Sequence, residues 1–219
     1  MKVLILAGGF ATRLWPLSEQ RAKPLFLING KTILAHIFDI LPGAAEVTLL
    51  TNEKFSADFL AEVKSLGREH QTEIFCEDAH SDGEKVGALK AVSLACENQN
   101  INETVYVFAG DNLLPDLKIT DLSCAEDQAC ITVREVKTFD EAQKFGVAEL
   151  KKSADFFDVV GFEEKPHQPK SKFVSTGFMA IGKGLLPILH RYAAKQPDAL
   201  GGIFPEFLKQ KKAVIARKV

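Results

Sequence analysis

The chain contains 219 residues, 46% of them apolar and 26% charged, and its formal net charge is −2. This length and composition suffice for one globular domain with a sizeable hydrophobic core. The near-neutral charge argues against binding to nucleic acid or to membrane surfaces, which usually requires a basic excess. No segment approaches the roughly 18 consecutive apolar residues of a membrane span, and glycines follow the first apolar run too soon for a signal peptide, so a cytoplasmic location is expected.

The first 110 residues alternate between short apolar runs, typical of strands, and segments in which apolar residues recur with helical spacing. This alternation predicts an α/β fold with a mostly parallel sheet and helices on both faces. In such sheets, ligands bind beyond the carboxyl ends of the strands. In chain order, the expected elements are strand Lys2–Leu6, helix Lys31–Leu41, strand Glu46–Thr51, helix Ala57–His70, strand Thr72–Cys76, helix Glu84–Asn98 and strand Thr104–Ala109.

The second half of the chain has a looser pattern, in which strand-like runs are joined by polar connectors. These runs favour a small antiparallel β region. No linker, low-complexity tract or internal repeat interrupts the chain, so a single domain over residues 1–219 is predicted. The expected elements are strands Cys130–Val136, Gly146–Leu150, Val159–Glu163 and Phe173–Ile181, helices at about Lys183–Lys195 and Gly202–Gln210, and a last strand-like run at Ala213–Ala216.

The four cysteines form no C-x-x-C pair and lie in or near apolar runs, which predicts buried, reduced thiols and neither disulfides nor a zinc site. The five histidines have no metal-ligand spacing. No Ser-His-Asp or Cys-His set is plausible, so a protein nucleophile is not expected.

The segment LAGGFATRLWPLSEQRAKPL follows the first predicted strand directly. Gly8 and Gly9 permit a tight turn whose backbone N–H groups can converge on a phosphate. Arg13 adds a planar fork that suits phosphate oxygens, and Lys23 adds a point charge. A Gly-Gly turn alone often only connects two elements, but two cations in the same loop favour phosphate binding.

Gly110-Asp111-Asn112 ends the predicted strand Thr104–Ala109, at the same sheet edge as the glycine loop. A carboxylate beside a phosphate loop is a natural Mg²⁺ ligand, because Mg²⁺ prefers oxygen donors and bridges protein to phosphate. The alternative is an Asx-type turn or a helix cap.

Two motifs of the second half also invite a functional interpretation. In Glu163-Glu164-Lys165-Pro166, the acids either form a solvated strand end or, with the lysine, hold a hydroxyl and a phosphate side by side. In Ser175-Thr176-Gly177, a glycine interrupts an apolar strand, which often marks the close approach of a ligand or of another backbone.

Together these segments resemble the sugar-1-phosphate nucleotidyltransferases, a family that includes glucose-1-phosphate thymidylyltransferase and mannose-1-phosphate guanylyltransferase. LAGGFATRLWPLS…AKPL is similar to the family's G-G-x-G-T-R-L…K-P signature, and FAGDN to its metal aspartate motif. EKVGALKAV resembles the helix start that meets the nucleobase, and FGVAEL the sugar-contacting glycine segment. GFEEKPHQPKS is similar to the Glu-Lys-Pro motif, and FVSTGFMAI to the strand behind the sugar. The six motifs stand in the family's order between about Leu6 and Ile181.

The resemblance implies a Rossmann-like nucleotidyltransferase core, with a nucleotide-binding half at residues 1–112 and a sugar-phosphate-binding half at residues 113–219. It also implies Mg²⁺-dependent nucleotidyl transfer, in which Arg13, Lys23, Asp111 and Lys165 act by positioning and charge neutralisation. The residues implied in nucleotide binding are Leu6, Ala7, Gly8, Gly9, Ala11, Thr12, Arg13, Lys23, Glu77, Gly87 and Asp111 (the last also as the metal ligand), and those implied in sugar-phosphate binding are Gly146, Glu164, Lys165 and Thr176.

The chain departs from the family pattern in three places. Ala11 stands where the loop has its third glycine, which costs little if the φ angle of Ala11 is negative. A second metal carboxylate is not evident, and Asp198 is the available candidate. The chain ends at Val219, before a Trp-x-Asp-Ile-Gly type of segment in which relatives commonly continue, as expected of a short form, a truncated chain or a weakened enzyme.

We expect the partners to be an NTP, with dTTP or UTP favoured over GTP, and a sugar 1-phosphate, with glucose 1-phosphate favoured. The oligomeric state stays open between monomer and homodimer. Two alternatives also stay open: a non-catalytic relative that binds an NDP-sugar, and a nucleotidyltransferase for a non-sugar phosphate acceptor. A choline-type acceptor would need an aromatic or acidic cage for its cation.

Overall fold

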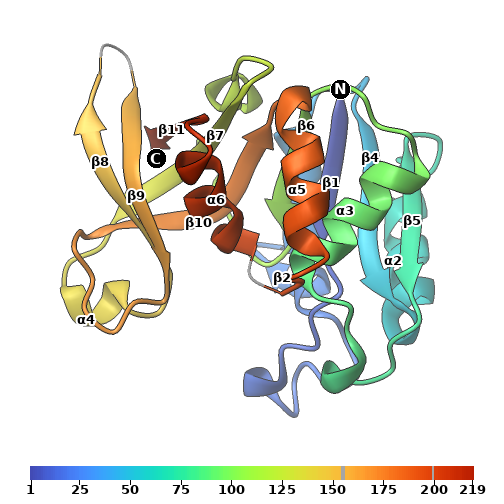
Figure 1. Ribbon diagram of the computed structural model, residues 1–219. Helices are drawn as coiled ribbons and strands as arrows, with labels where there is room; N and C mark the ends of the chain where they lie inside the picture. Colours follow the sequence, from blue (N-terminus) through green and yellow to red (C-terminus); the bar gives the residue numbers. More distant parts are fainter. Residues whose placement is uncertain (154–155, 199) are drawn as a thin grey trace.

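The computed structural model describes residues 1–153, 156–198 and 200–219 (Figure 1). Within these residues, a nine-stranded sheet runs across the whole molecule, and a separate two-stranded hairpin lies beside it. The strands of the large sheet are β1 (Lys2–Leu6), β4 (Glu46–Asn52), β5 (Thr72–Glu77), β6 (Val105–Ala109), β7 (Gln128–Glu135), β8 (Gly146–Lys152), β9 (Phe157–Glu164), β10 (Phe173–Ile181) and β11 (Ala213–Lys218), and the hairpin consists of β2 (Leu27–Ile28) and β3 (Lys31–Thr32). The helices are α1 (Ile33–Asp39), α2 (Ser56–Ser65), α3 (Ala88–Asn98), α4 (Phe139–Ala142), α5 (Leu186–Ala193) and α6 (Ile203–Lys209).

The strand order of the large sheet is β5-β4-β1-β6-β10-β7-β11-β9-β8. In the first half of the chain, β1 is parallel to both β4 and β6, and β4 is parallel to β5. In the second half, β10 is antiparallel to both β6 and β7, and β8 is antiparallel to β9. The predicted α/β architecture, a mostly parallel sheet followed by an antiparallel region, is confirmed.

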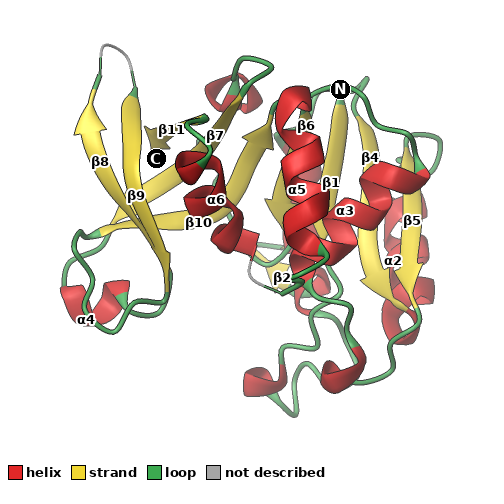
Figure 2. Cartoon of the chain, in the orientation of Figure 1, coloured by secondary structure: helices red, strands yellow, loops and turns green. Residues whose placement is uncertain are grey.

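Helices cover both faces of the parallel half (Figure 2). Successive residues of a strand point to opposite faces, and β1 shows this clearly. Leu4 belongs to the apolar cluster that includes α3 and α5, whereas Val3 and Ile5 belong to the cluster that includes α1 and α2. Because β1 is buried on both faces, it is a continuous apolar run rather than an alternating one.

The helix predicted at Lys31–Leu41 begins only at Ile33. The Thr32 hydroxyl accepts a hydrogen bond from the amide of Ala35 at 3.0 Å, which caps α1 at that residue. Lys31 instead belongs to the hairpin, which the sequence analysis did not predict.

Glycines with positive φ explain two further differences in helix boundaries. The helix predicted at Glu84–Asn98 starts only with α3, because Gly87 precedes it with a φ of +94°. The helix predicted at Ala57–His70 ends at Ser65, and Gly67 follows with a φ of +65°.

Burial of the cysteines is only partly as predicted. Cys96 and Cys130 are buried, and burial raises the pKa of each thiol to about 12. Cys124 is half-buried. Cys76 is exposed, contrary to the prediction, because it lies on β5, the edge strand of the sheet.

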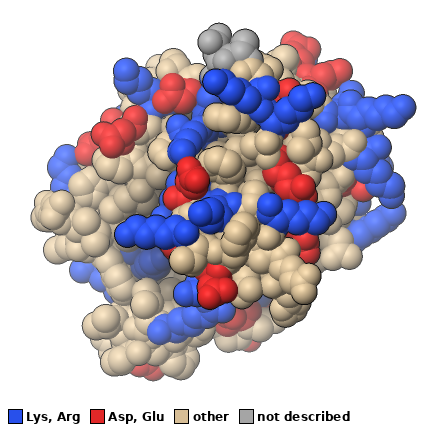
Figure 3. Space-filling view, turned by 90° about the vertical axis from the view of Figure 1, so that its left-hand side faces the viewer, with Lys and Arg blue, Asp and Glu red and all other residues tan. Residues whose placement is uncertain are grey.

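The antiparallel half carries surface charges of both signs. Figure 3 shows Lys and Arg side chains spread over this side of the molecule, with Asp and Glu between them. Ion pairs of this half include Lys218 with Glu135 at 2.7 Å and Lys170 with Glu149 at 3.5 Å. Among the described residues, no helix is both long enough and apolar enough to cross a membrane.

Candidate active site

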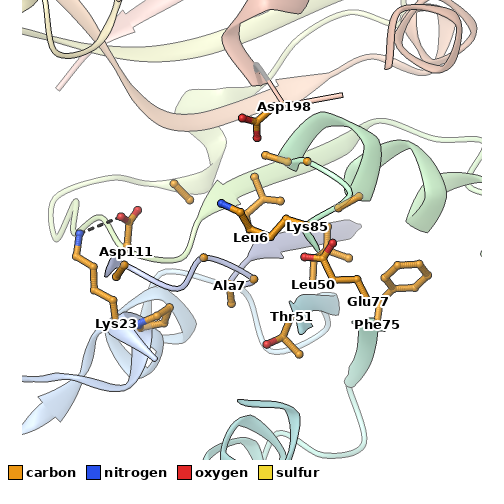
Figure 4. A pocket seen from close by; sticks show the side chains of 18 residues that line it. Leu6, Ala7, Lys23, Leu50, Thr51, Phe75, Glu77, Lys85, Asp111 and Asp198 are labelled. Carbon is orange, nitrogen blue, oxygen red and sulfur yellow. Dashed lines mark hydrogen bonds and ion pairs between the residues drawn. The ribbon is translucent and has the colours of Figure 1, made fainter. Parts of the chain in front are cut away.

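A cavity of about 260 Å³ opens at the carboxyl ends of β1, β4, β5 and β6 (Figure 4). This is the edge at which parallel sheets commonly bind ligands. Of the predicted nucleotide-binding residues, Thr12 and Arg13 do not line this cavity. Those that do are Leu6, Ala7, Gly8, Gly9, Ala11, Lys23, Glu77, Gly87 and Asp111.

The loop after β1 carries backbone amides that are free to bind an anion. Asn52 Nδ2 donates to the carbonyl of Gly8 at 3.0 Å, and Ser18 Oγ donates to the carbonyl of Ala11 at 2.7 Å. Within the described ranges, no hydrogen bond is found from the amides of Gly8 and Gly9. Successive free amides of this kind are the donors that phosphate-binding loops use.

Ala11 has a φ of 47°, in the left-handed region. Alanine costs little at this position only with a negative φ, so the loop carries strain that a glycine would relieve, roughly 1 kcal/mol. The next residues form a 3₁₀ turn, Thr12–Leu14, and both Thr12 and Arg13 are exposed there. The structure therefore leaves the Arg13 guanidinium outside the cavity wall.

Lys23 and Asp111 meet at one end of the cavity (Figure 4). Lys23 Nζ lies 2.9 Å from Asp111 Oδ2, and the side chains are 31% and 48% exposed. Lys23 begins a 3₁₀ turn that is anchored by buried Pro24 and Leu25, and Asp111 follows β6. Two separate elements thus place a cation and a carboxylate beside the free amides of the glycine loop.

Asp198 lines the same cavity, in the segment between α5 and α6. The carbonyl of the preceding Pro197 accepts a hydrogen bond from the amide of Lys90, in the first turn of α3, at 3.0 Å. A Cβ atom on Gly87 would lie 2.6 Å from the Pro197 carbonyl oxygen. Gly87 is therefore required both by its positive φ and by the close approach of the Asp198 segment.

Glu77 and Phe75 line the other end of the cavity (Figure 4). Glu77 Oε2 accepts a hydrogen bond from the amide of Val86 at 3.0 Å. Lys85 also lines the cavity, and its ammonium lies 2.8 Å from Asp82. Neither Phe75 nor Lys85 was predicted from the sequence. Phe75 could have been found from strand alternation, since residues two apart on β5 share a face.

Gly146, Glu164 and Lys165 lie together at the end of the β8–β9 pair, and none of them lines the cavity. Gly146 is the direct cross-strand partner of Glu164. Burial raises the pKa of Glu164, while the nearby Lys165 ammonium, 4.0 Å away, acts in the opposite direction. The carboxylate and the ammonium are therefore adjacent, as the Glu-Lys-Pro motif implies.

Thr176 turns its side chain into the core. Its hydroxyl is hydrogen-bonded to the hydroxyl of Thr132, and its carbonyl accepts a hydrogen bond from Asn112 Nδ2 at 2.7 Å. Gly177 has a φ of +81°, and a Cβ there would lie 2.7 Å from Cβ of Ala109. In this structure the glycine of β10 thus marks the close approach of another strand, next to the loop that carries Asp111.

The carboxylates in the cavity suit a divalent cation. Asp111 and Asp198 both line it and offer the oxygen donors that Mg²⁺ prefers, so these residues fit the ion. A second group, Glu53, Asp78 and His80, has donor atoms within 4.8 Å of one another, but all three residues are exposed and lie outside the cavity lining.

Comparison with known families agrees with this geometry. The family model for nucleotidyl transferases matches residues 2–218. The chain belongs to the nucleotidyl transferase family. The resemblance of this nucleotidyl transferase to the sugar-1-phosphate enzymes is also confirmed by its relatives.

This nucleotidyl transferase is 29% identical over 200 residues to the UTP–glucose-1-phosphate uridylyltransferase AglF of Haloferax volcanii, covering 87% of this chain and 75% of the relative. It is 26% identical over 197 residues to a glucose-1-phosphate thymidylyltransferase of Streptomyces griseus (89% and 52%). It is 27% identical over 214 residues to the D-glycero-alpha-D-manno-heptose 1-phosphate guanylyltransferase of Campylobacter jejuni (96% and 86%). The chain thus spans only about half the length of some curated relatives, among them the S. griseus protein.

Solved structures show the same fold. A Bacillus anthracis protein in complex with sucrose superimposes with a TM-score of 0.81 at 22% identity, covering 100% of this chain and 87% of that one. A UDP-glucose pyrophosphorylase complexed with UDP-glucose gives a TM-score of 0.77 at 18% identity, covering 99% and 89%. The nucleotidyl transferase described here therefore has the predicted Rossmann-like fold.

Proposed function

We propose that this protein transfers a nucleotidyl group from an NTP to a sugar 1-phosphate, giving an NDP-sugar and pyrophosphate, with Mg²⁺. The observation that carries the proposal is the Lys23–Asp111 pair beside the free amides of the glycine loop. The names of the relatives, which are uridylyl-, thymidylyl- and guanylyltransferases of sugar 1-phosphates, support the same reaction.

In this reaction, a phosphate oxygen of the sugar 1-phosphate forms a bond to the α-phosphorus of the NTP. The bond from the α-phosphorus to the bridging oxygen breaks, and pyrophosphate leaves with that electron pair. Such transfers need little covalent help, so positioning and charge neutralisation dominate. The amides of Gly8 and Gly9 and the Lys23 ammonium suit the triphosphate, and Arg13, exposed in the same loop and outside the cavity lining, is a further cation close to it in the chain.

Asp111 and Asp198 are the residues that would hold the magnesium ion. When bound, Mg²⁺ withdraws charge from phosphate oxygens and favours attack at phosphorus. Lys23, which balances Asp111 in this structure, then becomes available to the phosphates as a second cation.

The base end of the cavity favours uracil or thymine. The amide of Val86 donates to Oε2 of Glu77, and among the described residues no hydrogen bond reaches Oε1, which is therefore the oxygen more open to a donor of the base. Uracil and thymine present a single ring N–H at their pairing edge, whereas guanine presents two adjacent donors that would engage both oxygens. UTP and dTTP are therefore favoured over GTP, and Phe75 supplies an apolar wall for the base.

A pyrophosphate-release assay tests the proposal. Purified protein is incubated with Mg²⁺ and each pairing of UTP, dTTP, GTP, ATP or CTP with glucose, mannose or N-acetylglucosamine 1-phosphate. We expect release with UTP or dTTP and glucose 1-phosphate, and none after chelation with EDTA. Well-folded protein that releases nothing with any pair contradicts the proposal, and binding of an NDP-sugar without turnover would identify the non-catalytic alternative.

A further inference from the structure

Two glycines enclose the Glu164 carboxylate. Gly146 faces it across the β8–β9 pair, and Gly201 approaches it from the 3₁₀ turn Leu200–Gly202. A Cβ atom on Gly201 would lie 2.5 Å from Glu164 Oε2, and one on Gly146 would lie 2.9 Å from the same oxygen. Both distances are shorter than side-chain carbons tolerate, so each glycine leaves room that the carboxylate occupies.

The Phe162 ring borders the space between the two glycines and is held in place. Its side chain is buried, and its ring packs edge-on against Phe204 with centroids 5.0 Å apart. The Cβ on Gly201 would lie 2.7 Å from the Phe162 ring, and the Cβ on Gly146 would lie 2.5 Å from it. A methyl group on Gly201 would meet both this ring and the carboxylate. Phe204 backs the ring, whereas the Glu164 side chain is partly exposed and has room to move, so the carboxylate is the group that would be displaced further.

The Glu164 carboxylate has an unused capacity to accept hydrogen bonds. Its side chain is about one-third exposed, and Lys165 Nζ is 4.0 Å from Oε1. Among the residues that the structure describes, none donates a hydrogen bond to either oxygen. Burial raises the pKa of Glu164 and the Lys165 ammonium opposes that effect, while no hydrogen bond to the carboxylate contributes.

We propose that Gly201 is a positioning residue, whose missing side chain lets Glu164 point its carboxylate at a hydroxyl of the sugar phosphate. This inference rests on the proposed function. The same connecting segment carries Pro197 and Asp198, which approach Gly87 closely, and Asp198 also lines the nucleotide cavity. One short segment therefore borders both the nucleotide cavity and the Glu164 carboxylate, but through different residues. A change at Gly201 should therefore weaken binding of the sugar phosphate and leave binding of the nucleotide unchanged.

The test is Gly201→Ala, assayed for pyrophosphate release. We expect the KM for the sugar 1-phosphate to rise by about 10-fold or more, the loss expected for one hydrogen bond to a charged group. The KM for the NTP should stay within about twofold. Gly43→Ala is the matched control, because a Cβ there would meet no atom within 4 Å, and it should change neither value.

A double-mutant cycle with Glu164→Gln shows whether Gly201 acts through the carboxylate. The effects on the KM for the sugar 1-phosphate should be strongly non-additive, with the double variant close to Glu164→Gln alone. Additive effects, an unchanged KM, or an equal rise in the KM for the NTP would overturn the assignment. If Gly201→Ala does not fold, as judged by circular dichroism, Gly146→Ala places a methyl against the same oxygen and replaces it in the cycle.

Failure of the wild-type protein to release pyrophosphate would instead refute the proposed function, and the role of Gly201 with it. Wild-type turnover together with an unaltered Gly201→Ala variant would refute only the positioning role. The two failures are therefore distinguishable within one set of assays.

Discussion

At the scale of single residues, the site contains charged groups that matter for the proposed reaction because of where they lie, and that add little to the stability of the fold. Lys23 and Asp111 form an ion pair, yet both are substantially exposed, and exposed pairs contribute only about 0–1 kcal/mol. The folded protein can therefore lose either charge with little cost. The proposed reaction would not tolerate either loss, because in it the triphosphate and the metal ion both need a partner at this point.

Lys23→Ala and Asp111→Ala should each lower kcat for pyrophosphate release by about 100-fold or more, the scale of losing one preorganised charged contact in a transition state. The melting temperature should move by no more than about 4 °C, since the pair adds little to stability. Lys31→Ala is the matched control, because Lys31 pairs with Asp39 at 2.8 Å away from the cavity. Wild-type rates in either site variant would show that the site is misplaced.

Ala11, unlike the Lys23–Asp111 pair, has a clear effect on stability, because its backbone conformation is strained. Ala11→Gly should remove the strain of a φ of 47° and raise the free energy of unfolding by up to about 1 kcal/mol, partly offset by glycine's greater freedom in the unfolded chain. Urea unfolding measures the change. Ala44→Gly is the control, because Ala44 is exposed and does not have a positive φ, and this substitution should be neutral or destabilising. Equal destabilisation of both variants would contradict the strain at Ala11.

At the scale of elements, α3 and α5 are joined by a titratable contact. His190 Nδ1 lies 2.8 Å from Ser93 Oγ and 3.6 Å from a Glu97 oxygen. Burial lowers the pKa of His190, and Lys90 adds to that effect, whereas Glu97 opposes it. The imidazole is therefore held mainly in its neutral form between the two helices.

Because this pKa is depressed, the unfolded chain binds the proton more readily than the folded protein. The stability that the neutral His190 contributes is therefore fully present above the usual histidine pKa of about 6.5, and it is lost as the pH falls below that value. The free energy of unfolding should drop from pH 7 to pH 5 less steeply in His190→Asn than in the wild type. His70→Asn, at an exposed position, should keep the wild-type slope. Parallel slopes in all three proteins would rule out this linkage.

Apolar periodicity predicted nearly every strand and helix, because each element buries residues at a fixed spacing. It misplaced helix starts where local chemistry decides them, at the Thr32 hydroxyl and at the positive φ of Gly87. In the site, the family resemblance implied many of the residues that line the cavity, but also Thr12 and Arg13, which do not line it, and it did not show the direction of a side chain. Thr176 shows the difference: its motif implies a sugar contact, and its hydroxyl is bonded to Thr132 in the core.

At the scale of the whole molecule, the strand order was beyond sequence reasoning, because it depends on pairs that are distant in the chain. Alternation predicts that β1, β4, β5 and β6 share a parallel sheet. It does not predict that β10 lies between β6 and β7 and so joins the two halves. The continuous sheet supports the proposal of a single domain over residues 1–219.

The position of β10 also bears on how the protein is made. A ribosome releases β6 about 70 residues before it completes β10, the strand that covers the outer edge of β6. At roughly 5–20 residues per second, the nascent parallel half keeps an open strand edge for several seconds. An uncovered edge is a template for pairing with other chains. Synthesis of this protein therefore includes an interval in which a nearly complete parallel half needs protection from aggregation.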